Sequence, residues 1–320
     1  MEEKMARWIS LLILILVSAT AYAEIKPRAA LLMPEATKAV FLDLAAHNEK
    51  IFAVGERGII IRSDDQGDSW QQIASPMDVT LTSIKFSSAN VGWIVGHEST
   101  ILRTDDGGDS WQISQYKPEA DKFYMSVNFV SAEQGYVLGT DGELWVTADA
   151  GKSWQLTVLS VEEWFQNHLF GIETIGSSSL VAAERGGVFY SKNGLTDWQT
   201  IPSPYEGSYF GVNKLANNFL IYGMSGRVYL LDAISLQWTK IDVGTDQFLL
   251  DATQLAGNRG AIVVGRGGVI LYFDEQGKLQ KKSERQSRVD FTAVTTSKQN
   301  VYLASMAGGI EKVSISSIVK

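Results

Sequence analysis

The chain has 320 residues and a formal net charge of −8 at pH 7, from 28 basic and 36 acidic side chains. Because a nucleic-acid-binding protein needs a basic face that neutralises phosphates, this charge argues against that class of function. Cysteine is absent, which excludes disulfides, thiolate metal sites and a cysteine nucleophile. The 29 glycines and nine tryptophans against only six prolines favour an all-β chain with many tight turns.

The N-terminal residues have the pattern of a secretory signal peptide. Lys4 and Arg7 precede an apolar run at residues 8–17, and the small-residue stretch that follows ends in Ala21-Tyr22-Ala23. The apolar run is too short to cross a hydrocarbon core of ~30 Å, so a membrane anchor is disfavoured. We expect residues 1–23 to be removed and residues 24–320 to form one exported domain that does not span a membrane.

The first predicted hairpins carry a motif of the form Ser/Thr-x-Asp-x-Gly-x-Ser-Trp, known as the Asp-box. The Asp carboxylate can accept hydrogen bonds from its own turn, the Gly permits a positive φ, and the Trp can wedge between sheets. We therefore interpret these repeated aspartates as structural and not as catalytic acids. The complete copies comprise Ser63, Asp65, Gly67, Ser69 and Trp70; Thr104, Asp106, Gly108, Ser110 and Trp111; and Thr147, Asp149, Gly151, Ser153 and Trp154.

Later copies of the motif are incomplete. The fourth keeps Asn193 and Trp198, the fifth keeps mainly Trp238, and the sixth keeps Glu275 and Gly277. Counting one further position at Val313, where the repeat ends early, the motif starts near residues 63, 104, 147, 191, 231, 273 and 313.

Each copy follows a strand, a glycine-rich turn and a second strand, as in residues 51–63. In the second repeat we expect strands at residues 81–86, 91–95, 100–104 and 110–114. Four antiparallel strands repeated about every 42 residues are typical of a propeller blade, so the sequence predicts a seven-bladed β-propeller. The last repeat ends before its fourth strand. We expect residues 27–33 to pair with residues 310–313 and so close the ring with an N-terminal strand.

The segments Phe41-Leu42-Asp43-Leu44, residues 51–60 and residues 63–70 resemble the photosystem II stability and assembly factor family. The resemblance covers the chain from about Ala30 onward and is strongest in the first two blades. It implies an exported, non-enzymatic seven-bladed propeller that binds an immature membrane protein through an arginine-bearing face. The chain has no plastid-type transit peptide. We expect an exported protein in the periplasm, or in the thylakoid lumen if the organism is phototrophic.

One rim of the predicted propeller carries the glycine-rich turns and the loops between blades. Charged side chains in those turns would surround the mouth of the channel, where arginines could hold carboxylates or phosphates in bidentate fashion. The alternative is that neighbouring Glu and Arg side chains merely pair with each other. The candidate partner-binding residues are Glu56, Arg57, His97, Glu98, Asp141, Glu184, Arg185, Arg227 and Arg266, with Trp164 and Tyr205 from the inter-blade loops.

The sequence contains no signature of a metal or cofactor site. His47, His97 and His168 lie in different repeats without ligand spacing, and no phosphate-cradling or dinucleotide motif occurs. We therefore expect no cofactor and a monomeric scaffold that helps a membrane protein complex to assemble or to remain stable. The competing interpretation is an Asp-box glycoside hydrolase similar to sialidases. It lacks support because no Tyr/Phe-Arg-x-Pro motif is present; Lys26-Pro27-Arg28-Ala29 is no substitute.

Overall fold

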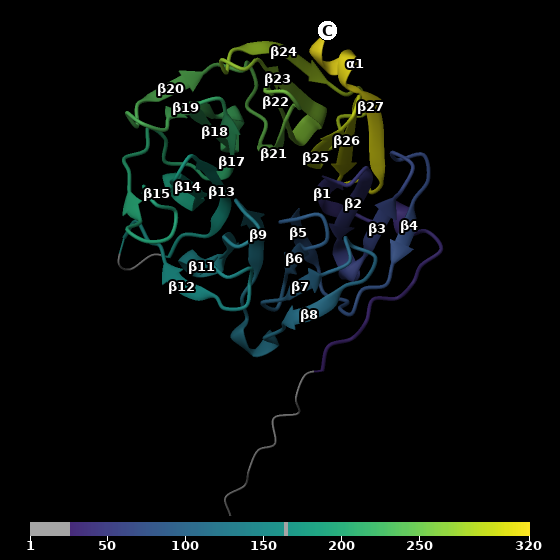
Figure 1. The fold of residues 1–320 in the computed structure, drawn as a ribbon. Coiled ribbons are helices and arrows are strands. Elements are labelled where there is room, and N and C mark those ends of the chain that lie inside the picture. Colours follow the sequence, from purple (N-terminus) through teal and green to yellow (C-terminus); the bar gives the residue numbers. More distant parts are fainter. Residues whose placement is uncertain (1–25, 163–165) are drawn as a thin grey trace, which may run out of the picture.

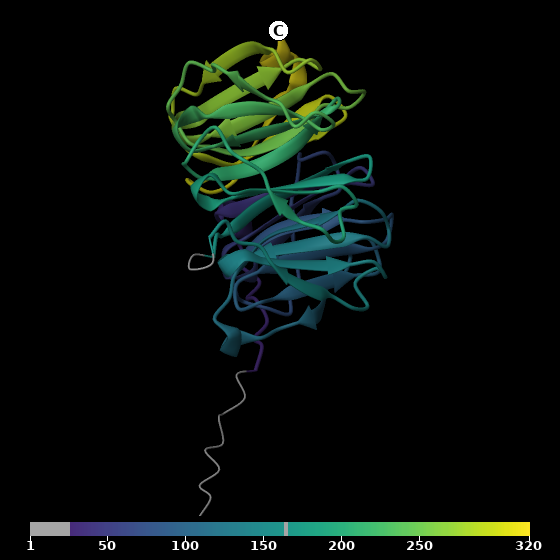
Figure 2. The ribbon, with the colours of Figure 1, turned by 90° about the vertical axis from the view of Figure 1, so that its left-hand side faces the viewer.

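The computed structural model describes residues 26–162 and 166–320, which form a ring of seven antiparallel sheets around a central channel (Figure 1). The side view shows the N-terminal half of the ring below the C-terminal half (Figure 2). The expected all-β, seven-bladed propeller is therefore confirmed. No helix among the described residues is long and apolar enough to cross a membrane.

Six blades contain four strands, numbered from the channel outward. Blade one comprises β1 (Phe41–His47), β2 (Lys50–Gly55), β3 (Ile60–Ser63) and β4 (Gln71–Ile73); blade two β5 (Leu81–Phe86), β6 (Gly92–Gly96), β7 (Ile101–Thr104) and β8 (Gln112–Gln115); blade three β9 (Tyr124–Phe129), β10 (Gly135–Gly139), β11 (Glu143–Thr147) and β12 (Gln155–Val158). Blade four comprises β13 (Leu169–Ile175), β14 (Ser178–Ala183), β15 (Val188–Ser191) and β16 (Gln199–Thr200); blade five β17 (Tyr209–Leu215), β18 (Asn218–Gly223), β19 (Val228–Asp232) and β20 (Trp238–Ile241); blade six β21 (Leu249–Gln254), β22 (Ala261–Gly265), β23 (Val269–Phe273) and β24 (Leu279–Glu284).

Blade seven has three strands in the described part of the chain, β25 (Phe291–Ser297), β26 (Asn300–Ser305) and β27 (Ile310–Ser314), followed by the helix α1 (Ile315–Val319). Short 3-10 turns occupy the remaining assigned positions: η1 (Ala36–Lys38), η2 (Glu56–Gly58), η3 (Pro118–Ala120), η4 (Thr140–Gly142), η5 (Glu184–Gly186), η6 (Met224–Gly226) and η7 (Arg266–Gly268).

The core of the described chain is divided among seven apolar clusters, and each cluster lies between two adjacent blades. The second strand of each blade is buried on both faces, because each face meets a neighbouring blade. In blades one to six, one large side chain at the start of the fourth strand or directly before it packs into the interface with the preceding blade. Trp70, Trp111, Trp154, Trp198, Trp238 and Leu279 have this position.

The three complete Asp-boxes fold into the same hydrogen-bonded turn. In the first, Ser63 Oγ donates to Asp65 Oδ1 at 2.8 Å, and the Ser69 N–H and hydroxyl donate to the two carboxylate oxygens at 2.8 and 2.6 Å. Asp106 and Asp149 make the same contacts. The hydrogen bonds from Ser69 are the largest cause that lowers the pKa of Asp65 to about 2. The carboxylates are thus occupied by their own turns.

The incomplete boxes keep the turn with different residues. In blade four, Asn193 Oδ1 accepts the N–H groups of Leu195 and Thr196. In blade six the accepting carboxylate is one residue earlier than the motif predicts: Asp274, and not Glu275, accepts the N–H groups of Gln276 and Lys278. An amide or a shifted carboxylate therefore supplies the same acceptor.

The predicted closure by an N-terminal strand is wrong. Residues 30–33 lie along blade one instead: the Ala30 N–H donates to the Ser75 carbonyl at 3.0 Å, and the Gln72 side chain bonds the backbone of Leu31 and Met33. The apolar position that an outer strand would fill in blade seven is taken by α1. Its Ile315 and Ile318 are each 3% exposed and complete the cluster between blades six and seven.

The first and last blades meet directly, so the ring is closed by packing and by polar contacts. The innermost strands join through Thr292, whose hydroxyl donates to the Phe41 carbonyl at 2.6 Å. The Tyr302 hydroxyl donates to the Gln66 carbonyl at 2.7 Å, and Lys312 Nζ lies 2.6 Å from an Asp68 carboxylate oxygen. The aromatic wedge Trp70 packs against the same interface. These contacts close the ring in place of the predicted pairing between residues 27–33 and residues 310–313.

Candidate functional site

One rim of the propeller is built from two kinds of segment that meet in every blade. The turn between the second and third strands approaches the residue that precedes the innermost strand, and a backbone hydrogen bond of 2.8–3.1 Å joins them. We call this surface the turn rim. The donors are the N–H groups of Glu56, His97, Thr140, Glu184, Met224, Arg266 and Met306, and the acceptors are the carbonyls of Val40, Thr80, Phe123, His168, Ser208, Phe248 and Asp290.

The turns at η2 and η5 place arginines at exposed tips. Arg57 has φ 55° and Arg185 has φ 53°, and each is followed by a glycine that also has positive φ. Two successive left-handed residues define the tight hairpin turn that Asn, Asp and Gly adopt most easily. Gly58 is required for a second reason, since a Cβ there would lie 1.8 Å from the Met77 carbonyl oxygen.

The glutamates next to these arginines turn toward the propeller and not toward their neighbours. A Glu56 carboxylate oxygen accepts the Val40 N–H at 3.2 Å, and a Glu184 oxygen accepts the His168 N–H at 3.3 Å. Both contacts tie the turn to the start of an innermost strand. Arg57 makes no ion pair with any described residue. The structure therefore favours a structural role for the glutamates and leaves the Arg57 guanidinium exposed on the turn rim.

The other predicted arginines are held by aromatic rings. The Arg266 guanidinium lies 4.7 Å from the ring centre of Phe248, and its Nε lies 3.7 Å from an Asp290 carboxylate oxygen. Arg227 lies 5.5 Å from the ring centre of the half-buried Tyr205. Such stacking orients a guanidinium without using its in-plane donors. Arg227 and Tyr205, which come from different loops, are thus brought together.

Two further candidates in blade two make local contacts. The His97 ring lies 4.5 Å from the Phe123 ring, and burial lowers its pKa below the usual value. A Glu98 carboxylate oxygen accepts the hydroxyl of Tyr116 at 2.7 Å. Burial, followed by this acceptor, raises the pKa of Tyr116 to about 12.

Blade three contributes a paired charge to the turn rim. The Asp141 carboxylate pairs with Lys122, which neutralises that part of the turn rim. Trp164 lies outside the described residues.

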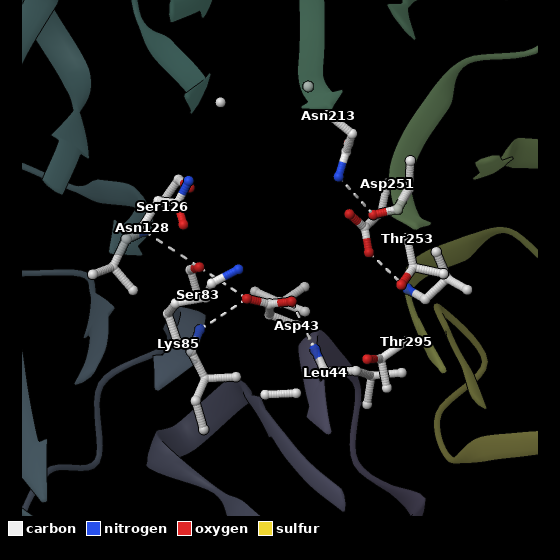
Figure 3. A pocket seen from close by; sticks show the side chains of 18 of the residues that line it. Asp43, Leu44, Ser83, Lys85, Ser126, Asn128, Asn213, Asp251, Thr253 and Thr295 are labelled. Atoms are coloured by element: carbon white, nitrogen blue, oxygen red, sulfur yellow. Dashed lines mark hydrogen bonds between the residues drawn. The ribbon is translucent and has the colours of Figure 1, made fainter. Parts of the chain in front are cut away.

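The channel contains polar residues that the sequence analysis did not select. Innermost strands enclose a cavity of about 820 Å³, and Asp43 from β1 and Asp251 from β21 face into it (Figure 3). Asp43 Oδ2 accepts the Ser83 hydroxyl and the Ile84 N–H, both at 2.8 Å. Asp251 Oδ2 accepts the Val294 N–H at 2.7 Å. Each carboxylate therefore links its blade to the next one at the channel wall.

The two channel carboxylates influence each other's ionisation. Burial raises the pKa of Asp43. Burial, and then the negative charge of Asp43, raises the pKa of Asp251 to about 8. Asp43 and Asp251 occupy the same place in their strands, at a register shift that follows Phe41 and Leu249. The repeated pattern of a large apolar residue, Leu and Asp at the start of a strand could have revealed them.

The described residues offer little for a metal ion. They contain no cluster of three or more His, Asp or Glu side chains that could hold one. The arrangement provides instead an exposed rim with cationic tips, a polar channel, and an opposite rim that holds the Asp-box turns.

The model of the family described as "Photosynthesis system II assembly factor YCF48" matches residues 68–226, close to half of the chain. No curated protein sequence matches the chain. A solved structure described as "YCF48 bound to D1 peptide" is 18% identical, has a TM-score of 0.68, and the match covers 91% of this chain and 96% of that one.

A structure of YCF48 from Cyanidioschyzon merolae is 14% identical with a TM-score of 0.68, covering 88% and 97% of the two chains. The WD40 propeller of Doa1, at 13% identity and a TM-score of 0.70 over 90% and 96%, shares the fold. The repeats and the ring of seven sheets agree, and the chain is a seven-bladed propeller that resembles the photosystem II assembly factor family, whose model matches residues 68–226.

Proposed function

We propose that this protein is an exported, non-enzymatic scaffold that binds a membrane protein through the turn rim and assists assembly or stability of its complex. The observation that carries the proposal is the placing of Arg57 and Arg185 in left-handed turn positions. Equivalent positions hold Asp141, Ser225 and Gly267 in other blades. Asp and Gly adopt this conformation at lower cost than Arg, so the arginines point to a binding role.

The chemistry of the rim fits an acidic or carboxylate-bearing peptide segment. A guanidinium presents paired donors that match a carboxylate, and Arg227 and Arg266 are already oriented by aromatic rings. The related structure with a D1 peptide shows that a propeller of this architecture can hold a peptide. The partner that we propose is a membrane protein, or a complex of them, exposed at the periplasmic or lumenal face.

The test replaces Arg57, Arg185 and Arg266 together by Ala and measures cross-linking to membrane proteins in the envelope. Loss of a desolvated Arg–carboxylate contact costs roughly 2–5 kcal/mol, whereas an exposed pair is worth about 0–1 kcal/mol. We expect the triple variant to lose its cross-linked partner while its unfolding midpoint stays near that of the parent protein.

The matched control replaces Lys152, Lys192 and Lys278 by Ala. These exposed lysines lie in the Asp-box turns on the opposite rim, so the control removes the same charge from the other side. It should keep the partner. Equal losses in both triple variants would show that only net charge matters, and turnover of an aryl sialoside that disappears with the arginines would favour a hydrolase.

A further inference from the structure

The outermost strand of blade seven has an open edge. In the other six blades a fourth strand pairs with the third, but in the described part of the chain no strand pairs with the outer side of β27 (Figure 1). An unpaired edge presents backbone donors and acceptors that another chain can use.

The register of β27 shows which of its backbone N–H and C=O groups face away from β26. The Ile315 N–H donates to the Gln299 carbonyl at 2.8 Å, and the same register pairs Val313 with Val301 and Glu311 with Leu303. Because hydrogen-bonded residues alternate in an antiparallel pair, the N–H and C=O groups of Ile310 and Lys312 face outward. Ile60 and Arg62 have the equivalent positions in blade one, where they pair with β4.

A segment that pairs with β27 needs to make only backbone hydrogen bonds, because α1 already supplies the apolar side chains of this interface. In the other blades a Trp or Leu, at the start of the fourth strand or directly before it, packs into the interface with the preceding blade, whereas α1 supplies Ile315 and Ile318 at blade seven. An incoming segment therefore has no pocket to fill. β16, which has two residues, shows how short a fourth strand can be in this ring.

The chain contains six examples of a segment in this position, and they define the chemistry that fits. The fourth strands are mostly exposed and rich in Gln, Thr, Ser and Lys. All run antiparallel to the third strand. The edge side chains Glu311 and Lys312 already pair with Arg285 at 2.9 Å and with Asp68 at 2.6 Å. A polar, uncharged segment is the best match.

A second copy of β27 fits less well. If two copies of β27 paired antiparallel about a twofold axis, only two registers would use the outward N–H and C=O groups of both Ile310 and Lys312 without extending beyond the strand. One places Glu311 opposite Glu311, and the other places Lys312 opposite Lys312. Like charges directly opposite each other destabilise a sheet.

We propose that β27 is a second partner-binding surface, which takes an extended polar segment of a partner protein as the fourth strand of blade seven. The inference rests on the proposed scaffold function and adds a backbone-directed contact to the arginine contacts of the turn rim. Two to four residues of the partner would bond the backbone of Ile310 and Lys312.

The test uses a capped synthetic peptide with the sequence of residues 71–75, Gln-Gln-Ile-Ala-Ser, and amide hydrogen exchange in the full chain. In the free protein we expect the amides of Ile310 and Lys312 to exchange about tenfold or more faster than those of Glu311 and Val313. Saturating peptide should slow the first two by about tenfold and leave the second two unchanged.

Two variants of Lys312 separate backbone from side-chain effects. Lys312→Ala keeps the outward N–H and should bind the peptide within about threefold of the parent, whereas Lys312→Pro removes the N–H and should weaken binding about tenfold. The triple Arg→Ala variant of the turn rim should bind the peptide normally. A loss of peptide binding at β27 can therefore be distinguished from a loss of partner binding at the turn rim. Unchanged exchange at millimolar peptide would overturn the proposal. Slow exchange in a protein that sediments as a dimer would also overturn it, since a second copy would then cover the edge.

Discussion

At Gly151 the absence of one methyl group decides how two blades fit together. The residue has φ +74°, and a Cβ there would lie 2.2 Å from Cη2 of Trp93 in the preceding blade. Trp93 is fully buried and stacks on Phe129, with ring centres 5.3 Å apart. The Asp-box glycine therefore serves the turn conformation and the inter-blade contact at once.

We expect Gly151→Ala to lower the free energy of unfolding by ~1–3 kcal/mol through overpacking, in addition to the cost of a positive φ. Gly176→Ala is the matched control, because Gly176 has φ +65° and no atom within 4 Å of the added methyl. Chemical denaturation of both variants measures the difference. Equal losses would mean that packing against Trp93 contributes nothing.

The raised pKa of Asp251 predicts how the stability of the protein depends on pH. Asp251 has its pKa raised to about 8 by burial and by Asp43, whereas an unfolded aspartate titrates near ~3.9. Between these values the folded state keeps a proton that the unfolded state releases. The contribution of Asp251 to stability is therefore complete below about pH 4 and decreases as the pH rises toward 8.

Asp251→Asn should remove this dependence, since an amide oxygen can still accept the Val294 N–H but cannot ionise. We expect the variant to gain stability relative to the parent as pH rises from 5 to 8, by at most about 1.4 kcal/mol per pH unit. Urea unfolding at a series of pH values measures the gain. Asp246→Asn, at an exposed position of the loop that joins blades five and six, is the control. A constant difference between variant and parent across the range would contradict the assignment.

Several residue roles follow from the sequence because they repeat. The acceptor role of Asp65, Asp106 and Asp149 follows from a motif whose spacing fixes its own turn. The roles of Asp43 and Asp251 do not follow, because each carboxylate accepts hydrogen bonds from the neighbouring blade at the channel wall. The inward turn of Glu56 and Glu184 does not follow either, since the N–H groups that they accept belong to Val40 and His168, just before the innermost strands.

Among the elements, α1 packs apolar side chains into the interface between blades six and seven, as the outer strands do in the other blades. Its two isoleucines lie one turn apart on the face that meets blades six and seven. Ser314 caps the helix, with its hydroxyl accepting the Ser316 N–H. The helix therefore ends the last blade without leaving its apolar interface open.

Ile318→Ala should lower the free energy of unfolding by ~2–5 kcal/mol, because it opens a cavity in the cluster between these blades. Ser317→Ala, on the exposed face of the same helix, should change it by less than about 0.5 kcal/mol. Thermal and urea unfolding measure both. A small effect of Ile318→Ala would show that blade seven is stable without its helical plug.

Repetition also explains which elements the sequence predicts. The strands of the second repeat lie within two residues of their expected bounds, because alternating apolar residues and glycine-rich turns recur in register. The end of the ring does not repeat, so no earlier copy could indicate that a helix would complete it. The sequence predicts that blade seven lacks a fourth strand, but the N-terminal segment lies along blade one and does not supply that strand.

At the scale of the whole molecule, closure of the ring places all of the second-to-third-strand turns on one rim and all Asp-box turns on the other. Seven repeated backbone hydrogen bonds hold the turn rim to the innermost strands. In the proposed function, this rigidity would let arginines from different blades act together on one partner, since binding would then cost little ordering of the scaffold.

The central claim is that the turn rim contacts a membrane protein and the Asp-box rim does not. Site-specific photo-cross-linking in intact cells tests it, with a photoreactive residue placed in turn at positions 57, 185 and 266, and at positions 152, 192 and 278. The account predicts the same membrane-protein adduct from the first three positions and none from the second three. An adduct that forms equally from both rims, or only from the Asp-box rim, would contradict it.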